Sequence, residues 1–178
     1  MKSSTLKIMW KAIVIVLLFW GCSSKEPQQR AVEKKKDTIS VKEQLANANK
    51  LVAQNEETAI EKYISRRNWS VRKMSNGIRI WEYEEGKGKK VDYNDEITIK
   101  YRLEAINGHL IYDETVDFHV GTQEVQIGLD QALRELKIGS KAKIIIPSHL
   151  GYGLVGDGNR IPKMAVLIYD LNVLKLNN

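Results

Sequence analysis

The residue types and spacings in this chain lack the clusters that most catalytic sites require. His109, His119 and His149 stand ten and thirty positions apart, with no cysteine pair and no HExxH motif, so no zinc site is expected. No serine lies in a GxSxG elbow and Cys22 is the only cysteine, which leaves a covalent nucleophile without support. Gly86-Lys87-Gly88 is turn chemistry, because the Gly-Lys-Ser/Thr of a phosphate loop does not follow it.

What the sequence offers instead is an apolar region with a few hydrogen-bonding groups. The segment from Ser148 to Ile161 reads SHLGYGLVGDGNRI, in which four glycines accompany Tyr152. A glycine-rich loop of this kind, next to strands of branched apolar residues, suits a pocket that binds an apolar group and orients it with one or two hydrogen bonds. We therefore expect no metal and no other cofactor.

The elements that must position these residues begin after residue 70, where the apolar period becomes two. Apolar and aromatic residues occupy every second position from Ile97 to Leu103, which predicts a strand with one buried face over Glu96–Glu104. Asn107-Gly108 follows at once. This pair is typical of a type I′ hairpin, with positive φ at both residues, so the chain should reverse into a second strand through Leu110 and Tyr112.

A short helix and two further strands complete the expected domain. Apolar residues return to helical spacing between Val125 and Leu136, and Gly139 beyond them permits a left-handed end. Residues 140–147 and 164–176 are β-prone. In the first of these strands the residues that share one face are Ala142, Ile144 and Ile146. Antiparallel strands around one short helix predict an α+β domain over residues 70–178.

A helix is expected ahead of this domain, within residues 41–69. Ser40 and Glu43 fit a capping box, and apolar residues recur at three- and four-residue steps as far as Ile64. The polar run Asn55-Glu56-Glu57 interrupts the apolar face and is a candidate break. The helix either packs on its own domain, which we expect, or pairs with a partner helix, and the oligomeric state stays open. Trp69 is expected to be a packing residue.

The first 22 residues have the layout of an export signal. Three lysines precede an apolar run from Ala12 to Trp20, which is too short for a membrane span of about 20 helical residues. Gly21-Cys22 at its end resembles the lipobox of bacterial lipoproteins, in which the cysteine is lipidated. This predicts a lipoprotein signal peptide over residues 1–21 and a lipid anchor on Cys22. The alternatives are a plain secretory signal or an uncleaved anchor, with Cys22 incidental.

The net positive charge of the chain comes from its N-terminal part. The formal net charge is +6, yet residues 70–178 hold fifteen basic and fifteen acidic residues. A neutral domain gives no footprint for a phosphate backbone, so nucleic acid is not an expected partner. Residues 22–40 are polar and lack an apolar period, which predicts a tether. The Lys34-Lys35-Lys36 run within it is expected to be solvated rather than bound to anionic lipid.

The stretch from Pro147 to Leu176 resembles the C-terminal half of FKBP-type peptidyl-prolyl cis-trans isomerases. A strand ending in Pro147 is followed by Tyr152-Gly153, a loop closing on Ile161-Pro162, and a last strand with Tyr169-Asp170. Upstream residues at family-like positions are Tyr101, Gly108, Tyr112-Asp113, Phe118, Val125 and Gly139. With its signal and helical spacer, the chain is most similar to the gliding-motility-associated FKBP-like lipoproteins of bacteria.

The resemblance implies an FKBP-like twisted antiparallel sheet wrapped around a short helix, with a proline-binding cleft between them. It implies that Tyr152 holds a substrate carbonyl and that Asp113 orients or polarises it, so both are candidate catalytic residues. The implied substrate-binding residues are Tyr101, Tyr112, Phe118, Val125, Gln126, Leu129, Ile161 and Tyr169. Taken one at a time, all of these residues also have a plain interpretation as core, turn or loop residues.

The chemistry of such a cleft follows from the X-Pro bond, whose rotation has a barrier of about 18–20 kcal/mol because the planar amide is resonance-stabilised. A cleft that removes water from the carbonyl disfavours the polar planar state relative to the twisted one. Leu129 stands where many family members have tryptophan, and Gln126 replaces an apolar residue. Val116 is smaller than the aromatic residue often found near that wall. These differences predict a wider and weaker pocket than is usual.

The expected function is a membrane-tethered peptidyl-prolyl cis-trans isomerase that acts on proline-containing polypeptides and assists folding of exported envelope proteins, gliding-motility components being one class of candidates. The alternative is a chaperone or interaction module of the same fold with little or no activity, and a third possibility is a structural lipoprotein that assembles through its helix. The expected location is the cell envelope, lipid-anchored, with the domain in the periplasm or at the cell surface.

Overall fold

The computed structural model describes residues 28–122 and 126–177, with side chains from Val41 onward. The elements in chain order are α2 (Gln28–Arg67), β1 (Arg72–Lys73), β2 (Arg79–Glu84), β3 (Glu96–Ala105), β4 (Leu110–His119), α3 (Ile127–Leu133), β5 (Lys141–Ile146), the 3₁₀ turn η1 (Ser148–Leu150) and β6 (Leu167–Asn177). The expected signal peptide and the lipidation residue Cys22 lie outside the described residues.

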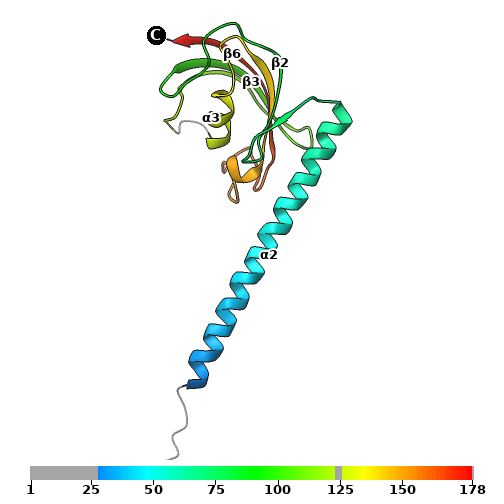
Figure 1. Ribbon diagram of the computed structural model, residues 1–178, viewed down its shortest axis with the longest axis vertical. Helices are drawn as coiled ribbons and strands as arrows, with labels where there is room; N and C mark the ends of the chain where they lie inside the picture. Colours follow the sequence, from blue (N-terminus) through cyan, green and yellow to red (C-terminus); the bar gives the residue numbers. More distant parts are fainter. Residues whose placement is uncertain (1–27, 123–125, 178) are drawn as a thin grey trace, which may run out of the picture. The chain divides into compact units, whose positions relative to one another are not determined.

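The strands form one antiparallel sheet in the order β1-β2-β5-β6-β3-β4. Figure 1 shows this sheet curling around the short helix α3, which lies in its concave face. The central strands β5, β6 and β3 are joined by long ladders, with β6 pairing along the whole of β3. The expected α+β arrangement, a twisted antiparallel sheet around a short helix preceded by an N-terminal helix, is confirmed.

The hairpin between β3 and β4 forms where it was expected, but its turn is of another type. Gly108 has a φ of 86°, whereas Asn107 is not among the residues with positive φ. The Gly108 N–H donates to the Ala105 carbonyl at 2.8 Å, and the Ala105 N–H donates to the His109 carbonyl at 3.0 Å. This pattern fits a longer loop in which only the glycine is left-handed, so the type I′ prediction is wrong.

The sheet buries side chains on both of its faces. Ile144 and Ile146 belong to the main core on the α3 side, and Ile145 between them belongs to a second cluster with the C-terminal turns of α2. Side chains alternate across a strand, so two cores are needed to bury three consecutive isoleucines. The expected shared face of Ala142, Ile144 and Ile146 is confirmed.

Helix α2 is longer than the sequence pattern predicted. It runs without interruption from Gln28 to Arg67, so both the start at Ser40 and the break at residues 55–57 are wrong. Residues 28–40, expected as a tether, are rich in Gln, Glu, Lys, Arg and Ala, which have high intrinsic helix propensity even without an apolar face. Residues before Lys50 fall into a separate unit from the compact unit Lys50–Asn178, and each unit is described by itself.

The last turns of α2 belong to the compact unit and pack on its sheet. Ile60, Tyr63 and Ile64 are buried, while Val41 and Leu45 in the other unit are exposed. Trp69 follows the helix and packs against Tyr63 and Trp81, with ring centroids 5.4 Å apart in each pair. Packing of the helix on its own domain is therefore confirmed for these turns, and so is the expected packing role of Trp69.

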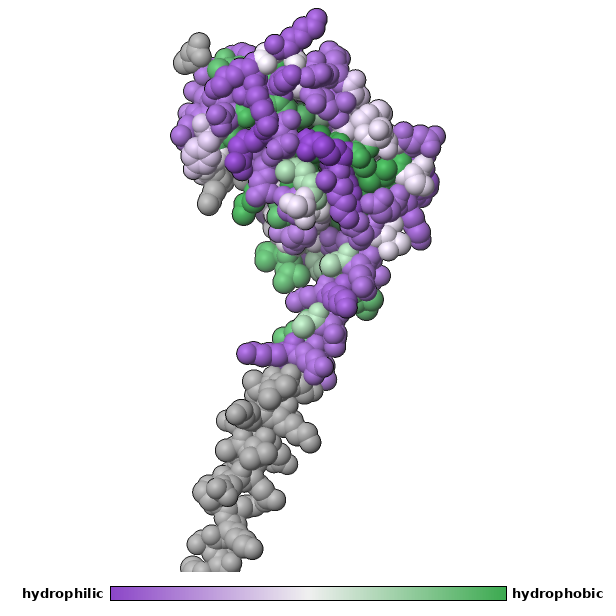
Figure 2. All heavy atoms as spheres, viewed as in Figure 1, coloured by the Kyte–Doolittle hydropathy of each residue, from purple (hydrophilic) through white to green (hydrophobic). Residues whose placement is uncertain are grey.

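The surface of the compact unit is largely polar in the view of Figure 2, where hydrophilic side chains surround separate small apolar areas. Among the residues that the structure describes, no helix combines the length and the apolar character needed to cross a membrane.

A buried arginine also ties α2 to the sheet. The Arg79 side chain on β2 is only 1% exposed, and its Nη2 lies 2.6 Å from a Glu57 carboxylate oxygen and 2.8 Å from one of Glu61. Its Nη1 donates to the Gly77 carbonyl, and Lys73 Nζ lies 2.6 Å from the same Glu57 oxygen. The polar run that interrupts the apolar face of α2 therefore supplies an acidic partner for a buried cation.

This ion cluster predicts an acid-sensitive contribution to stability. Hydrogen bonds from Lys73 and Arg79 lower the pKa of Glu57 below its ordinary value of 4.5. The unfolded chain then binds the proton more readily than the folded one, so the contribution is complete above the ordinary pKa and is lost as pH falls through the lowered pKa. Urea unfolding midpoints from about pH 7 to about pH 3 should fall less steeply for Glu57→Gln than for the wild type. If the midpoints of both proteins fall equally steeply with pH, the Glu57 ion pairs do not cause the acid sensitivity.

Candidate active site

A cavity of about 250 Å³ opens between the sheet and α3. Its walls come from β3, β4 and β6, with α3 and the loop after β5 completing it. The residues that line it are Ile99, Tyr101, Leu103, Val116, Asp117, Phe118, Gln126, Leu129, Tyr152 and Tyr169. The space between sheet and short helix is therefore hollow, as a binding cleft requires.

Strand alternation explains how the apolar walls are built. Ile99, Tyr101 and Leu103 occupy every second position of β3 and so share one face. Tyr169 on β6 pairs with Leu103 in the ladder, and its ring centroid lies 5.4 Å from that of Tyr101. Leu129 on α3 is 2% exposed and closes the opposite side of the cavity. The cavity is thus mainly aromatic and aliphatic.

A chain of three polar groups crosses this apolar cavity. The Tyr169 hydroxyl donates to Gln126 Oε1 at 2.7 Å, and Gln126 Nε2 in turn donates to the Tyr152 hydroxyl oxygen. A tyrosine hydroxyl has one proton to donate besides its lone pairs. Since Tyr152 accepts from Gln126, its own proton is available for a group that enters the cavity.

The tyrosines of the cavity keep their protons at neutral pH. Burial, with a smaller effect of the nearby Asp157, raises the pKa of Tyr152 above 10.0. Burial and the Glu114 carboxylate raise the pKa of Tyr101 to about 12, and burial raises the pKa of Tyr169 well above its ordinary value. All three hydroxyls are therefore neutral hydrogen-bond donors rather than bases.

Asp157 organises the loop that carries Tyr152. Its Oδ1 accepts the backbone N–H groups of Asn159 and Ile161 at 2.8 and 2.7 Å, and its Oδ2 accepts the Tyr112 hydroxyl at 3.0 Å. Burial alone would raise the pKa of Asp157, but these donors lower it. The carboxylate thereby fastens the tip of the loop to strand β4.

The structure places six of the expected site residues along the cavity. They are Tyr101, Phe118, Gln126, Leu129, Tyr152 and Tyr169. Tyr112 and Ile161 are not part of the lining of this described cavity: Tyr112 holds the loop through Asp157, and Ile161 is buried in the adjoining core. Val125 lies outside the described residues. The substrate-binding roles themselves stay predictions.

Asp113 is not among the residues that line the cavity, which gives no support to its expected contact with a bound carbonyl. It is exposed and pairs in the β3–β4 ladder with Arg102, whereas Tyr112 pairs with Leu103 and Glu114 with Tyr101. Residues opposite one another in a ladder share a face, so Asp113 lies on the face away from Tyr101 and Leu103. The Tyr101 hydroxyl donates at 3.4 Å to Glu114, its partner in the ladder, and the acid among the lining residues of this cavity is Asp117.

This placement makes a prediction for Asp113. Asp113→Ala should leave kcat/KM on a proline-containing peptide within about twofold of the wild-type value, because the carboxylate contacts neither the cavity nor its hydroxyl groups. A protease-free isomerisation assay measures the rate. A loss as large as that caused by a change of Tyr152 would show that Asp113 acts on the substrate.

Three lining residues were not singled out for the pocket in the sequence analysis, namely Ile99, Leu103 and Asp117, and a fourth, Val116, was expected near one wall without a binding role. The alternation of β3 puts Ile99 and Leu103 on the same face as Tyr101. The sequence therefore contained the information that they could line a pocket, although only Tyr101 was expected to do so. Asp117 bonds through its carboxylate to Thr98 and Asn177. That carboxylate therefore already has partners, and the cavity gains no free acid from it.

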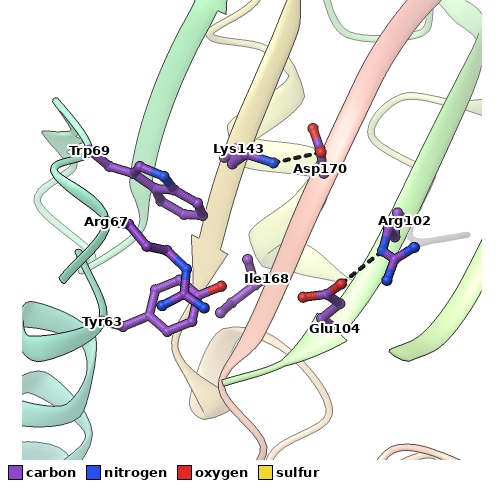
Figure 3. Close-up of a pocket in the computed structure, with 8 residues that line it drawn as sticks. All are labelled: Tyr63, Arg67, Trp69, Arg102, Glu104, Lys143, Ile168 and Asp170. Atoms are coloured by element: carbon purple, nitrogen blue, oxygen red, sulfur yellow. Dashed lines mark hydrogen bonds and ion pairs between the residues drawn. The ribbon is translucent and has the colours of Figure 1, made fainter. Parts of the chain in front are cut away.

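A second cavity, of about 270 Å³, lies between the end of α2 and the other face of the sheet (Figure 3). Its lining consists of Tyr63, Arg67, Trp69, Arg102, Glu104, Lys143, Ile168 and Asp170. Lys143 pairs with Asp170 at 2.5 Å and Arg102 with Glu104 at 2.7 Å, while the Arg67 guanidinium lies 3.5 Å from the centroid of the Tyr63 ring. The charged groups named here therefore have partners within the lining itself.

The described residues hold no group of three or more His, Cys, Asp or Glu side chains arranged to bind a metal ion. Apart from the Asp117 carboxylate, which is bonded to Thr98 and Asn177, the polar groups that line the first cavity are hydroxyl and amide groups, which position a substrate through hydrogen bonds.

Comparison with known proteins gives a consistent assignment. Residues 87–174 match the FKBP-type peptidyl-prolyl cis-trans isomerase family. The chain is 35% identical over 106 residues to an FK506-binding protein of Neisseria meningitidis serogroup B, a match that covers 56% of this chain and 96% of that protein. It is 36% identical over 93 residues to the human peptidyl-prolyl cis-trans isomerase FKBP9, covering 49% of this chain but only 16% of that longer relative.

The fold is also similar to that of solved members of this family. A solved peptidyl-prolyl cis-trans isomerase from Pseudomonas syringae pv. tomato superposes with a TM-score of 0.63 at 22% identity, covering 72% of this chain and 96% of the other. At that identity the likeness concerns the fold alone. The sequence match over nearly the whole Neisseria protein carries the assignment further: the chain belongs to the family of FKBP-type peptidyl-prolyl cis-trans isomerases.

Proposed function

We propose that the domain catalyses cis-trans isomerisation of X-Pro bonds in polypeptides, with the prolyl ring in the cavity between β3, β6 and α3. The observation that carries this proposal is the Tyr152 hydroxyl, which accepts from Gln126 and so has its proton available to a mainly aromatic and aliphatic cavity. The volume of about 250 Å³ lies below the roughly 300–1,000 Å³ of sites for drug-sized ligands. It suits a single side chain of a longer substrate.

The proposed mechanism needs no nucleophile. The barrier to rotation, about 18–20 kcal/mol, comes from amide resonance, which makes the planar state the more polar one. The aromatic and aliphatic walls remove water from the bound amide and so disfavour that planar state. The Tyr152 hydroxyl holds the carbonyl that precedes proline, and the walls formed by Tyr101 and Tyr169 grip the ring. Contacts that are stronger with the twisted amide lower the barrier.

A refolding reaction limited by prolyl isomerisation tests this proposal. The purified protein should accelerate the slow phase, which takes tens to hundreds of seconds without catalyst, and the acceleration should fall when Tyr152 is replaced by Phe. Acceleration that survives this change and also survives removal of a cavity wall by Tyr101→Ala would favour a chaperone that binds unfolded chains elsewhere on its surface. No acceleration at all would reject catalysis.

The proposed function includes a lipid anchor. Cys22 directly follows the apolar run and Gly21, which supports lipidation after removal of residues 1–21 and a location in the cell envelope. Mass spectrometry of the protein from membranes should find an N-terminus at Cys22 with added acyl mass. An unmodified N-terminus elsewhere would refute the anchor.

The clients we propose are exported proteins of the envelope, gliding-motility components among them in a host that glides. The likeness to gliding-motility-associated FKBP-like lipoproteins rests on the order of signal, helical spacer and one FKBP domain. Loss of the gene in a gliding host should slow spreading on surfaces, and Tyr152→Phe should not restore it. Normal spreading in the deletion strain would remove this client class.

A further inference from the structure

A carboxylate from α2 contacts the start of the loop that carries Tyr152. Glu56 Oε2 accepts the backbone N–H of Ser148 at 3.2 Å, and Glu56 Oε1 accepts the Ser148 hydroxyl. The two residues are 92 positions apart in the chain, and Ser148 is only 6% exposed. One carboxylate therefore satisfies both donors of a buried serine at the first residue of η1.

Ser148 in turn holds the backbone on both sides of Tyr152 through hydrogen bonds. Its carbonyl accepts the N–H of Gly151 at 3.1 Å and that of Gly153 at 2.8 Å. The Gly153 carbonyl in turn accepts the N–H of Met164 at 2.7 Å. Tyr152 stands between the two glycines that Ser148 holds, and glycines have more backbone freedom than other residues. The position of the Tyr152 hydroxyl therefore depends on the position of Ser148.

Glu56 is itself held in place by the docking of α2. It lies one helical turn before Ile60, and residues at this spacing share a helix face. Ile60 is 1% exposed in the cluster with Ile145 and Ile168, and the neighbouring Glu57 pairs with the buried Arg79. The carboxylate is thus presented to Ser148 by a helix whose next turn, through Glu57 and Ile60, is attached to the sheet.

We propose that Glu56 is a positioning residue for Tyr152: through Ser148 it sets the loop so that the Tyr152 hydroxyl stands at the cavity. The N-terminal helix is then part of the isomerase site, although it contacts no substrate. This inference rests on the proposed role of Tyr152. It differs from a general stabilising role for Glu56 because its effect must pass through the Tyr152 hydroxyl.

The test measures kcat and KM of the full chain on a proline-containing peptide in two backgrounds, wild type and Tyr152→Phe. In the wild-type background Glu56→Ala should lower kcat about fivefold with KM within about twofold, since an interacting pair of groups contributes on this scale. Glu56→Gln keeps an acceptor for the Ser148 hydroxyl and should recover most of kcat. In the Tyr152→Phe background Glu56→Ala should cause no further loss.

Two other variants keep the test decisive. Glu43→Ala removes an exposed acid from the same helix and should leave kcat unchanged, which controls for charge. Ser148→Ala removes only the hydroxyl donor and should also lower kcat. It replaces Glu56→Ala in the test if Glu56→Ala does not fold.

The outcomes separate this inference from the proposed function. If Tyr152→Phe has the wild-type rate, the role of Tyr152 itself fails. If Tyr152→Phe lowers kcat but folded Glu56→Ala keeps the wild-type rate, or lowers kcat equally in both backgrounds, Glu56 does not position Tyr152 and the inference is overturned.

Discussion

Tyr152→Phe should lower kcat/KM for a proline-containing peptide about tenfold while the protein stays folded. The change removes one hydroxyl, which accepts from Gln126 and offers its proton to the cavity, and one hydrogen bond to an amide carbonyl is worth about 1.4 kcal/mol, or a factor of ten in rate. The pKa of Tyr152 is raised by burial. The hydroxyl is therefore protonated at neutral pH, and the loss should be the same from about pH 6 to about pH 9.

Tyr93→Phe is the matched control, because it removes the hydroxyl of an exposed tyrosine away from the cavity lining. It should leave the rate unchanged, and circular dichroism should show both variants folded. A wild-type rate for Tyr152→Phe would mean that the substrate carbonyl is held by another group, or by none.

Glu57→Ala combined with Glu61→Ala should lower the free energy of unfolding by about 3 kcal/mol, because a buried cation that loses its partners retains the full cost of desolvation. The Arg79 side chain is 1% exposed and its two carboxylate partners both come from α2. With them removed, the Gly77 carbonyl is its remaining hydrogen-bond acceptor among the described contacts. Urea unfolding followed by circular dichroism measures the change.

A triple variant that adds Arg79→Met distinguishes a buried charge from lost contacts in general. Replacing a whole buried ion cluster by an apolar side chain of similar length is often nearly neutral, so the triple variant should recover at least half of the lost stability. A triple variant less stable than the double one would show that Arg79 contributes through packing and not through a charge that needs partners.

The local patterns of the sequence were sufficient for the elements around the cavity. Alternation from Ile97 to Leu103 identified β3 and its buried face, and the glycine-rich run around Tyr152 identified the loop at the cavity. The position of the hairpin also followed from Asn107-Gly108. Its turn type did not, because the φ of Asn107 depends on the hydrogen bonds that the paired strands leave for the turn.

The register between β3 and β4 determines which face of the sheet carries the Asp113 side chain. The family resemblance placed it beside Tyr112, and neighbours along a strand point to opposite faces. Which of them shares the sheet face of Tyr101 and Leu103 depends on the partner across the ladder, and Leu103 pairs with Tyr112. A one-residue change in register would exchange the two, so no count along the chain could settle the choice.

The sequence by itself determined the type of fold, the family and the apolar, hydroxyl-bearing chemistry of the cavity, because these depend on periodicity and on motifs spread along residues 87–174. Only the tertiary structure decided that α2 buries Ile145 from behind the sheet, that Glu57 faces Arg79 and that Glu56 reaches Ser148. Those contacts join residues 22 to 92 positions apart. Contacts between such distant residues arise from the docking of whole elements, and no local period encodes them.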